Sequence, residues 1–265
     1  MFQSKILNTL IFLVLISKSI FCGVVVLGNL HRVHDIYPGQ TQNGNIIISN
    51  PTKERTQVKV YITDYRFDAD GKTSYGDPST NPRSNARWID MGSEIITIEA
   101  QESYELNYFI NVPQDSTLNG TYWSMVMIQE VVEREGSGPE SGLHMRTATR
   151  TGIQMITNIN RETITDITII DSRLRQTESQ NFLVCDIQNT GNTLVITDFQ
   201  VELYNFDGNC LGIYSGEQRA VYPKMSTRLQ VELGDVSPGK YKALIILDCG
   251  KNNVFGADYT LELGS

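Results

Sequence analysis

Apolar residues in this chain recur at every second position, and this period constrains the fold more than any other feature of the sequence. Two clear runs have their apolar residues at Leu106, Tyr108, Ile110 and Val112, and at Phe199, Val201 and Leu203. Successive side chains on a β-strand point to opposite faces, so these runs indicate strands with one buried and one exposed face. No stretch of about a dozen residues carries the apolar stripe of a helix. The sequence therefore predicts an all-β protein.

Turn-forming pairs separate the predicted strands. They include Pro38-Gly39, Asp70-Gly71, Asn119-Gly120, Asp207-Gly208 and Pro238-Gly239. Short strands between such turns favour antiparallel sandwiches, and 265 residues suffice for two domains. We expect two tandem immunoglobulin-like antiparallel β-sandwiches, one over residues 24–158 and one over residues 162–265. Each half has an apolar run that ends in an Asn-containing turn, at 46–51 and at 183–189, which suggests a duplicated topology. The loops 77–87 and 133–143 are polar and are expected to be exposed.

Residues 1–23 have the pattern of a secretory signal peptide. Lys5 precedes the uninterrupted apolar run 10–16, which is too short to cross a bilayer. A buried N-terminal strand is the alternative, but it does not explain the charge before the run. We expect an exported protein, periplasmic or at the cell surface. No later apolar run reaches about 18 residues, so no transmembrane segment is expected in the mature chain. A net charge of −8 argues against a nucleic-acid partner.

Three cysteines follow the predicted signal peptide: Cys185, Cys210 and Cys249. Cys185 alternates with Leu183 and should face a core, and Cys249 shares a face with Leu247. In an immunoglobulin strand order both would lie near one pole of the sandwich, so Cys185–Cys249 is the candidate disulfide. Buried free thiols are the alternative.

The sequence contains few signs of catalysis or metal binding, and we expect no enzyme and no cofactor. His31 and His34 would point to opposite faces of one strand, as exposed residues of an edge strand. No G-x-S-x-G and no phosphate-binding G-x-x-x-x-G-K motif occurs. Asp68-Ala69-Asp70-Gly71 could be a calcium loop, but Arg66 stands where an oxygen ligand is needed. A hairpin turn at Asp70-Gly71 is the preferred interpretation. Trp123 lies in an apolar strand and is expected in a core.

Three segments resemble periplasmic pilus-assembly chaperones. They are 46–65 (IIISNPTKERTQVKVYITDY), 112–131, which begins Val-Pro-Gln-Asp, and 146–155, which looks like the last strand of the chaperones' first domain. The resemblance covers residues 30–158. A similar pattern occurs in WxL-interacting surface proteins, whose second domain has a P-G-x-Y motif like Pro238-Gly239-Lys240-Tyr241.

The resemblance implies a set of binding residues. The chaperones hold a subunit's terminal carboxylate with an Arg on the first strand and a Lys on the last strand of domain one. Arg32 matches the Arg, whereas Gln154 stands at the Lys position and carries no charge. The stretch 145–153 is rich in Thr, which makes it a poor plug for an apolar groove. We expect the edge strand 145–156 and the face near Arg32 to bind other proteins by strand addition. The candidate residues are Arg32, Arg150, Ile153 and Gln154.

The resemblance favours an exported protein-binding module, a chaperone or assembly factor for surface or fimbrial structures. Its partners would be other exported or surface proteins. The alternative is a structural or adhesive cell-surface protein in which the domains act as spacers. The sequence leaves the partner, the organism and the oligomeric state open.

Overall fold

The computed structural model describes residues 23–92, 94–131, 148–177 and 180–264. Nearly all of the predicted signal peptide and the whole 133–143 loop lie outside these residues. In the described part of the chain, the only helix is the short 3₁₀ turn η1, Ala86–Trp88. The strands are β1 (Val25–Leu27), β2 (His31–Asp35), β3 (Thr41–Ser49), β4 (Thr56–Phe67), β5 (Thr73–Gly76), β6 (Ile89–Asp90), β7 (Ile95–Ile98), β8 (Ser103–Asn111), β9 (Gly120–Glu130), β10 (Arg150–Ile159), β11 (Ile167–Gln176), β12 (Asn181–Asn189), β13 (Val195–Tyr204), β14 (Cys210–Ser215), β15 (Arg219–Val221), β16 (Ser226–Glu232), β17 (Gly239–Asp248) and β18 (Val254–Leu263).

Strands β1 to β10 form the first sandwich. One sheet has the order β1-β3-β8-β6, and the other has the order β2-β10-β9-β4-β5, with β7 also paired to β4. The chain passes from one sheet to the other between β1 and β2. As a result β1 pairs antiparallel with β3, whereas β2 pairs parallel with β10. All other strand pairs are antiparallel.

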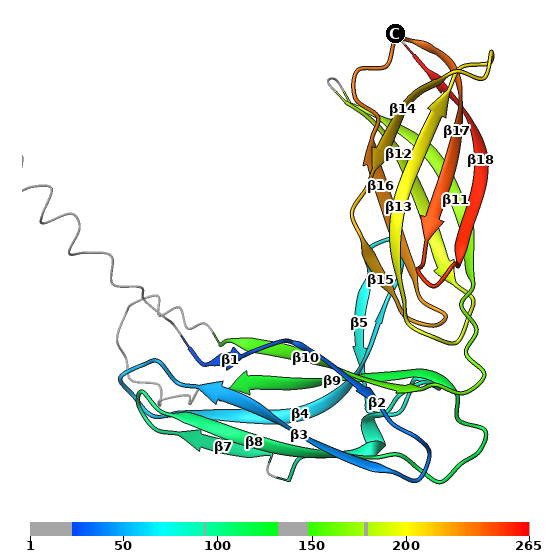
Figure 1. Cartoon of the computed structure of the whole chain (residues 1–265). Coiled ribbons are helices and arrows are strands. Elements are labelled where there is room, and N and C mark those ends of the chain that lie inside the picture. The colour runs from blue at the N-terminus through cyan, green and yellow to red at the C-terminus, as the bar shows by residue number, and fades with distance from the viewer. Residues whose placement is uncertain (1–22, 93, 132–147, 178–179, 265) are drawn as a thin grey trace, which may run out of the picture.

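Strands β11 to β18 form the second sandwich. Its sheets have the orders β11-β12-β16 and β14-β13-β17-β18, and β15 pairs with the start of β13. The second sandwich stands across one end of the first, and the β4–β5 hairpin extends from the first sandwich to the side of the second (Figure 1). The predicted domain limits, 24–158 and 162–265, fall around the linker between the end of β10 and the start of β11; the limits themselves stay a prediction.

The predicted alternation places side chains in two separate cores. In the first sandwich Leu106, Tyr108 and Ile110 are buried and belong to one apolar cluster. In the second, Phe199 and Val201 are buried in another cluster. The all-β prediction and the prediction of tandem immunoglobulin-like sandwiches are therefore confirmed.

The loop 77–87 is less exposed than its polar sequence suggested. Asn81 and Asn85 are buried, and Asp64 near the end of β4 explains why. Its carboxylate accepts hydrogen bonds from the Asn81 backbone N–H (2.6 Å) and from the Ser84 hydroxyl (2.5 Å). The expectation of an exposed loop holds for residues 77, 78, 80, 82 and 87 and is wrong at Asn81 and Asn85, because a buried carboxylate holds the loop there through polar contacts that an apolar pattern does not reveal.

Candidate protein-binding site

The edge of strand β10 that faces away from β9 is paired with another strand along only part of its length. Its parallel pairing with β2 begins at Gln154, beside His31, and ends at Asn158, beside Asp35. Within the described residues no strand pairs with Arg150–Ile153 on that side. The prediction of an edge strand over 145–156 is right for 150–153 and wrong from Gln154 on, because the sequence did not reveal that β2 changes sheets. Residues 145–147 lie outside the described residues.

The hydrogen bonds at both ends of this free segment show where its backbone groups point. The Gln154 N–H donates outward to the Leu30 carbonyl (2.8 Å). The Thr149 carbonyl instead accepts from the Glu130 N–H on the β9 side (3.0 Å). Backbone groups alternate in direction along an antiparallel strand. The N–H and C=O groups of Arg150 and Gly152 therefore point away from β9, toward the uncovered side.

The four candidate residues do not share a face of their sheet. Gln154 lies beside His31, whereas Arg32 lies beside Met155, whose side chain is fully buried. Paired residues project to the same face, so Gln154 faces outward and Arg32 faces the interior of the first sandwich. Arg150 shares the outward face with Gln154, and Ile153 is fully buried in the core. The basic residue beside Gln154 on the outer face is His31, which the sequence analysis assigned no binding role.

Arg32 lies near a buried polar pair between the two sheets of the first sandwich. His34 Nε2 and the Tyr108 hydroxyl are 2.9 Å apart, and His34 Nδ1 lies 3.3 Å from the Ile156 carbonyl. Burial lowers the pKa of His34 and raises the pKa of Tyr108. The prediction that His34 is exposed is therefore wrong. The Arg32 Nε atom is buried and has no hydrogen-bond partner among the described residues.

The outer face of β9 and β10 meets the second sandwich through aromatic residues. The ring of Trp123 stacks on that of Tyr222, with centroids 4.7 Å apart, and both side chains are buried. The Tyr222 hydroxyl donates to Gln154 Oε1 at 2.5 Å. Ile156 completes this small apolar cluster. Gln154 thus serves as an acceptor for a side chain of the second sandwich, and burial raises the pKa of Tyr222.

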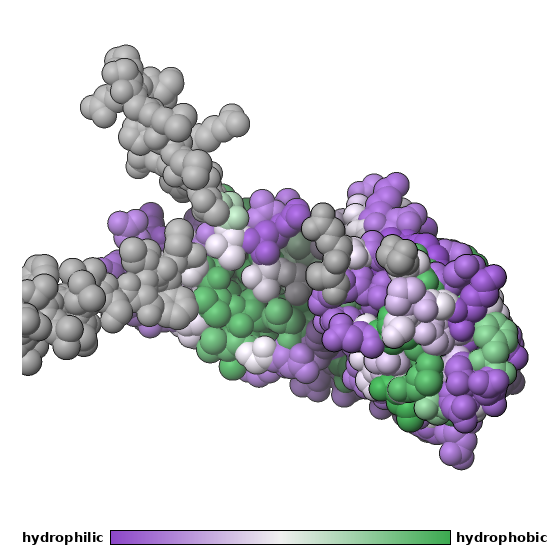
Figure 2. All heavy atoms as spheres, turned by 90° about the horizontal axis from the view of Figure 1, so that it is seen from above, coloured by the Kyte–Doolittle hydropathy of each residue, from purple (hydrophilic) through white to green (hydrophobic). Residues whose placement is uncertain are grey.

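Hydrophobic side chains also gather on the upper surface of the first sandwich, next to the second sandwich (Figure 2). Three apolar residues of the β1–β2 region are exposed: Leu27, Leu30 and Val33. Val33 lies beside Ile156 in the sheet. Arg150, on the same outer face, places its guanidinium 5.7 Å from the centre of the Tyr75 ring. Among the described residues, exposed apolar side chains and the contact between Arg150 and Tyr75 thus lie around the free β10 segment.

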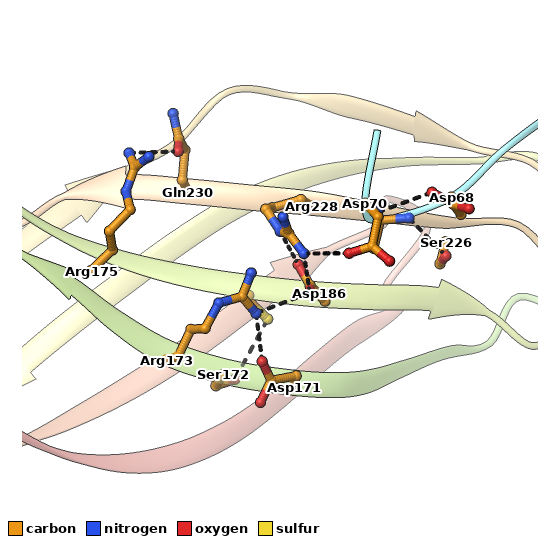
Figure 3. Close-up of polar contacts among 12 residues, drawn as sticks. Asp68, Asp70, Asp171, Ser172, Arg173, Arg175, Asp186, Ser226, Arg228 and Gln230 are labelled. Atoms are coloured by element: carbon orange, nitrogen blue, oxygen red, sulfur yellow. Dashed lines mark hydrogen bonds and ion pairs between the residues drawn. The ribbon is translucent and has the colours of Figure 1, made fainter. Parts of the chain in front are cut away.

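A charged contact joins the β4–β5 hairpin to the second sandwich (Figure 3). Arg228 on β16 binds both oxygens of Asp186, at 2.7 and 2.8 Å, and its NH2 group also contacts Asp70 at 3.1 Å. Arg173 contacts Asp186 at 3.0 Å. The Ala69 N–H donates to the Ser226 hydroxyl (3.0 Å). The hydrogen bond from Arg228 is the main cause that lowers the pKa of Asp186.

This hairpin is the turn that the sequence predicted at Asp70-Gly71. The strands on either side of it pair antiparallel from Asp64–Gly76 to Phe67–Thr73, and Gly71 has φ +77°. The preferred interpretation as a hairpin is therefore confirmed. Across the described residues, no three His, Cys, Asp or Glu side chains are placed to hold a metal ion.

A turn-to-turn contact forms the third link between the sandwiches. The Thr121 N–H donates to the Asn192 carbonyl (2.8 Å), and the Thr121 hydroxyl accepts from the Leu194 N–H (2.8 Å). Gly120, at φ +71°, packs against the same carbonyl, and a Cβ there would lie 2.0 Å from it. Sequence reasoning missed Tyr222, Arg228 and Asn192.

The cysteines of the second sandwich are present as free thiols in the structure. Cys185 is buried on β12, and Cys249 follows β17 in the other sheet. Burial raises the pKa of each thiol to about 11. Such thiols stay protonated at neutral pH, and the protonated form is a poor nucleophile. The Cys185–Cys249 bridge stays a prediction, and thiol titration of the unreduced, denatured mature chain tests it: one free thiol supports the bridge and three exclude it.

Comparison with known proteins supports the fold at the level of structure rather than of sequence. No protein-family model matches the sequence, and no curated protein matches it. A chaperone structure from a chaperone–tip adhesin complex of CFA/I fimbriae is 10% identical, covers 92% of this chain and 100% of its own, and has a TM-score of 0.50.

Two further structures are similar over nearly the whole chain. The CsuC–CsuE chaperone–tip subunit complex of Acinetobacter baumannii is 11% identical, with 89% of this chain and 98% of the other covered and a TM-score of 0.45. The SafA pilin–SafB chaperone complex of Salmonella enterica is 14% identical, with 92% and 99% covered and a TM-score of 0.44.

The first comparison confirms the fold that the resemblance implied, the two-domain immunoglobulin-like fold of periplasmic pilus chaperones. The similarity to WxL-interacting proteins stays a prediction. Over the described residues, no helix is long and apolar enough to cross a membrane.

Proposed function

We propose that this chain is an exported protein-binding module that acts as a chaperone or assembly factor for surface or fimbrial subunits. The free segment of β10 carries the proposal. Its outward N–H and C=O groups at Arg150 and Gly152 offer a template on which an extended segment of a subunit can add as a further strand. The structurally similar chaperone of CFA/I fimbriae occurs in a complex with a tip adhesin.

Within this proposal the four candidate residues have different roles. Arg150 and Gln154 face outward and line the binding surface, together with His31. Ile153 supports the strand from the core, and Arg32 lies behind it between the sheets. Because Gln154 carries no charge and already accepts a hydrogen bond from Tyr222, the surface binds its partner mainly through backbone pairing and apolar contact. The proposal assigns no catalytic residue and no cofactor.

Site-specific photo-crosslinking in the host cell tests the proposal. A photoreactive amino acid at position 150 should give one main adduct with an exported protein. The same amino acid at Lys240, which is exposed on the second sandwich far along the chain, is the matched control. Adducts that are absent at 150, or identical at 150 and 240, would contradict binding at the β10 edge.

Fractionation tests the proposed location. We propose an exported protein, and release by osmotic shock would place it in the periplasm, as expected for a chaperone. Retention on intact cells with cleavage by added protease would favour the structural or adhesive role instead.

A further inference from the structure

The carboxylate of Glu130, the last residue of β9, holds two backbone segments that are far apart in the sequence. Its Oε1 atom accepts a hydrogen bond from the Val24 N–H at 2.7 Å, and its Oε2 atom accepts one from the Thr149 N–H at 3.1 Å. Val24 is buried in the core of the first sandwich. Glu130 thus joins the beginning of the described chain to the residue that precedes β10.

Gly23 lies directly against this carboxylate. It is buried and has φ +106°, a conformation that favours glycine. A Cβ atom at this position would lie 2.5 Å from Thr149 Oγ1 and 2.7 Å from Glu130 Oε1. Since a Cβ atom lies about 2.5 Å from the nitrogen of its own residue, the Gly23 nitrogen is within about 5 Å of Glu130 Oε1. The backbone of Gly23 can approach Glu130 this closely because it has no side chain.

The half-buried carboxylate of Glu130 has no cation paired with it among the described residues, where the ion pairs involve other carboxylates. Lys53 and Arg55, in the turn between β3 and β4, line the same pocket as Gly23 and Glu130, and Glu54 lines it too. A carboxylate that is partly removed from water is stabilised by a positive charge within about 4–6 Å. The Gly23 nitrogen is close enough to supply that charge, but it carries none while it belongs to a peptide bond.

The predicted signal peptide ends at this point in the sequence. Signal peptidases cut after a small residue, and Ser19 and Cys22 are the small residues nearest to Gly23 on its N-terminal side. We propose that a signal peptidase cuts between Cys22 and Gly23, and that the new α-ammonium group of Gly23 forms an ion pair with the Glu130 carboxylate. Water adds to the peptide bond, so that Cys22 leaves with a new carboxyl group and the Gly23 nitrogen gains a hydrogen atom and then a proton from solvent. The cut lies one residue before the limit predicted from the sequence.

The position of Glu130 favours a cut after Cys22 over a cut after Ser19. An α-amino group has an ordinary pKa of about 7.7–8.0 and is mostly charged at neutral pH. A cut after Cys22 creates this charge at Gly23, beside the carboxylate, whereas a cut after Ser19 creates it at Ile20, three residues earlier in the chain. The pocket that Gly23 lines can hydrate the rest of the ammonium group, so the ion pair does not require the charge to lose all of its water.

This inference rests on the proposed export but not on the proposed binding of a partner. The mature N-terminus would lie beside Thr149, immediately before the free β10 segment that starts at Arg150. An uncut signal peptide would begin next to this edge. Processing would therefore remove it from beside the proposed binding surface, and Glu130 would hold the new end of the chain in place.

N-terminal sequencing and the intact mass of the chain exported by the host test the cut. The exported chain should begin at Gly23. A chain that begins at Ile20, or at any other residue than Gly23, would overturn the inference and leave the proposed export in place. A chain that keeps residues 1–22 would overturn the inference and would count against export as well.

Titration of the Gly23 α-amino group in the exported chain, followed by NMR, tests the ion pair. The carboxylate favours the charged amine, so the pKa of this amine should lie above its ordinary range and should fall in Glu130→Gln. Glu232→Gln is the matched control, because it removes an exposed carboxylate of the second sandwich that also accepts a hydrogen bond, from Gln180. This control should leave the titration of Gly23 unchanged.

The other charged side chains that line the pocket, Lys53, Glu54 and Arg55, are the same in all three chains, so a difference between the chains reports on Glu130. A purely structural role of the Glu130 hydrogen bonds would not move the titration of the amine. An amine pKa within the ordinary range in the unaltered chain would overturn the ion pair, as would an equal pKa in Glu130→Gln. If Glu130→Gln does not fold, the titration of the unaltered chain decides alone.

Discussion

In the first sandwich the side-chain amide of Asn50, just after β3, donates to the carbonyl oxygens of Glu54, Ile98 and Glu99. In the second, Asn189 at the end of β12 donates to those of Thr193 and Val221. Both side chains are fully buried, and each Oδ1 accepts a backbone N–H two residues later. The two sandwiches therefore close the same corner with the same residue type, which fits the duplicated topology that the sequence suggested.

The sandwiches differ at their free edges. The uncovered segment of β10 bears an outward cation, Arg150, and lies near the joint with the second sandwich. Strand β14 is uncharged and lies on the second sandwich. The buried Asn corner is thus shared by the two sandwiches, whereas the free edges that they present to other molecules differ. A shared fold accordingly does not give the two halves a shared role.

The largest effect should come from removing the shared corner residue. Asn50→Ala and Asn189→Ala each leave buried backbone groups without their partner, so each should lower the free energy of unfolding by about 3 kcal/mol. Urea unfolding measures both. The comparison breaks down if the two losses differ by more than about 2 kcal/mol, because the residues would then not be equivalent.

Removing Arg228 should have the next largest effect. Arg228→Gln leaves the nearly buried Asp186 carboxylate with Arg173 alone and should cost about 2 kcal/mol at neutral pH. Arg228 lowers the pKa of Asp186, so its stabilising effect is present at neutral pH and is lost as the pH falls through that pKa in the folded chain. The deficit of the variant should therefore shrink in acid. Asp70→Asn, at a carboxylate that is 86% exposed, is the control and should cost less than about 0.5 kcal/mol.

A smaller effect is expected at the joint between the sandwiches. Tyr222→Phe removes the hydrogen bond to Gln154 but keeps the stacking on Trp123, so it should cost about 1 kcal/mol. A double-mutant cycle with Gln154→Ala measures the coupling free energy between the two side chains. If the two losses of unfolding free energy simply add, the hydrogen bond does not contribute to stability.

The pH dependence of the Tyr222→Phe variant gives a second test at the joint. The pKa of Tyr222 is raised above its ordinary value of 10.0, so the folded chain holds this proton more tightly than the unfolded chain. The stability that this difference contributes is complete below pH 10 and falls as the pH rises further. Tyr222→Phe should therefore lose less stability than the unaltered chain above pH 10, as urea unfolding at several pH values would show.

Local patterns in the sequence predicted the strands and the hairpin turn well. The alternation at 106–112 and 199–203 correctly predicted which side chains are buried, because a strand that packs on one face needs apolar residues at every second position. The turn at Asp70-Gly71 could also be predicted from local sequence, because its backbone requires a residue that tolerates positive φ.

The candidate site was predicted only in part, because it depends on contacts between distant segments. Whether Arg32 and Gln154 share a face is set by the parallel register of β2 on β10, which neither strand encodes alone. Tyr222 meets Gln154 from 68 positions away, and Arg228 meets Asp70 from 158 positions away. Such contacts leave no periodic signal in the sequence.

Amide hydrogen exchange at single-residue resolution tests most directly the claim that β10 has a free edge at Arg150–Ile153. In the free chain the Arg150 and Gly152 amides should exchange quickly, whereas the Thr151 and Ile153 amides, which bond to β9, should be protected. Addition of the exported protein identified by photo-crosslinking at position 150 should then slow amide exchange at Arg150 and Gly152. Equal protection of all four amides in the free chain would contradict the account, because no outward group would be left for a partner strand.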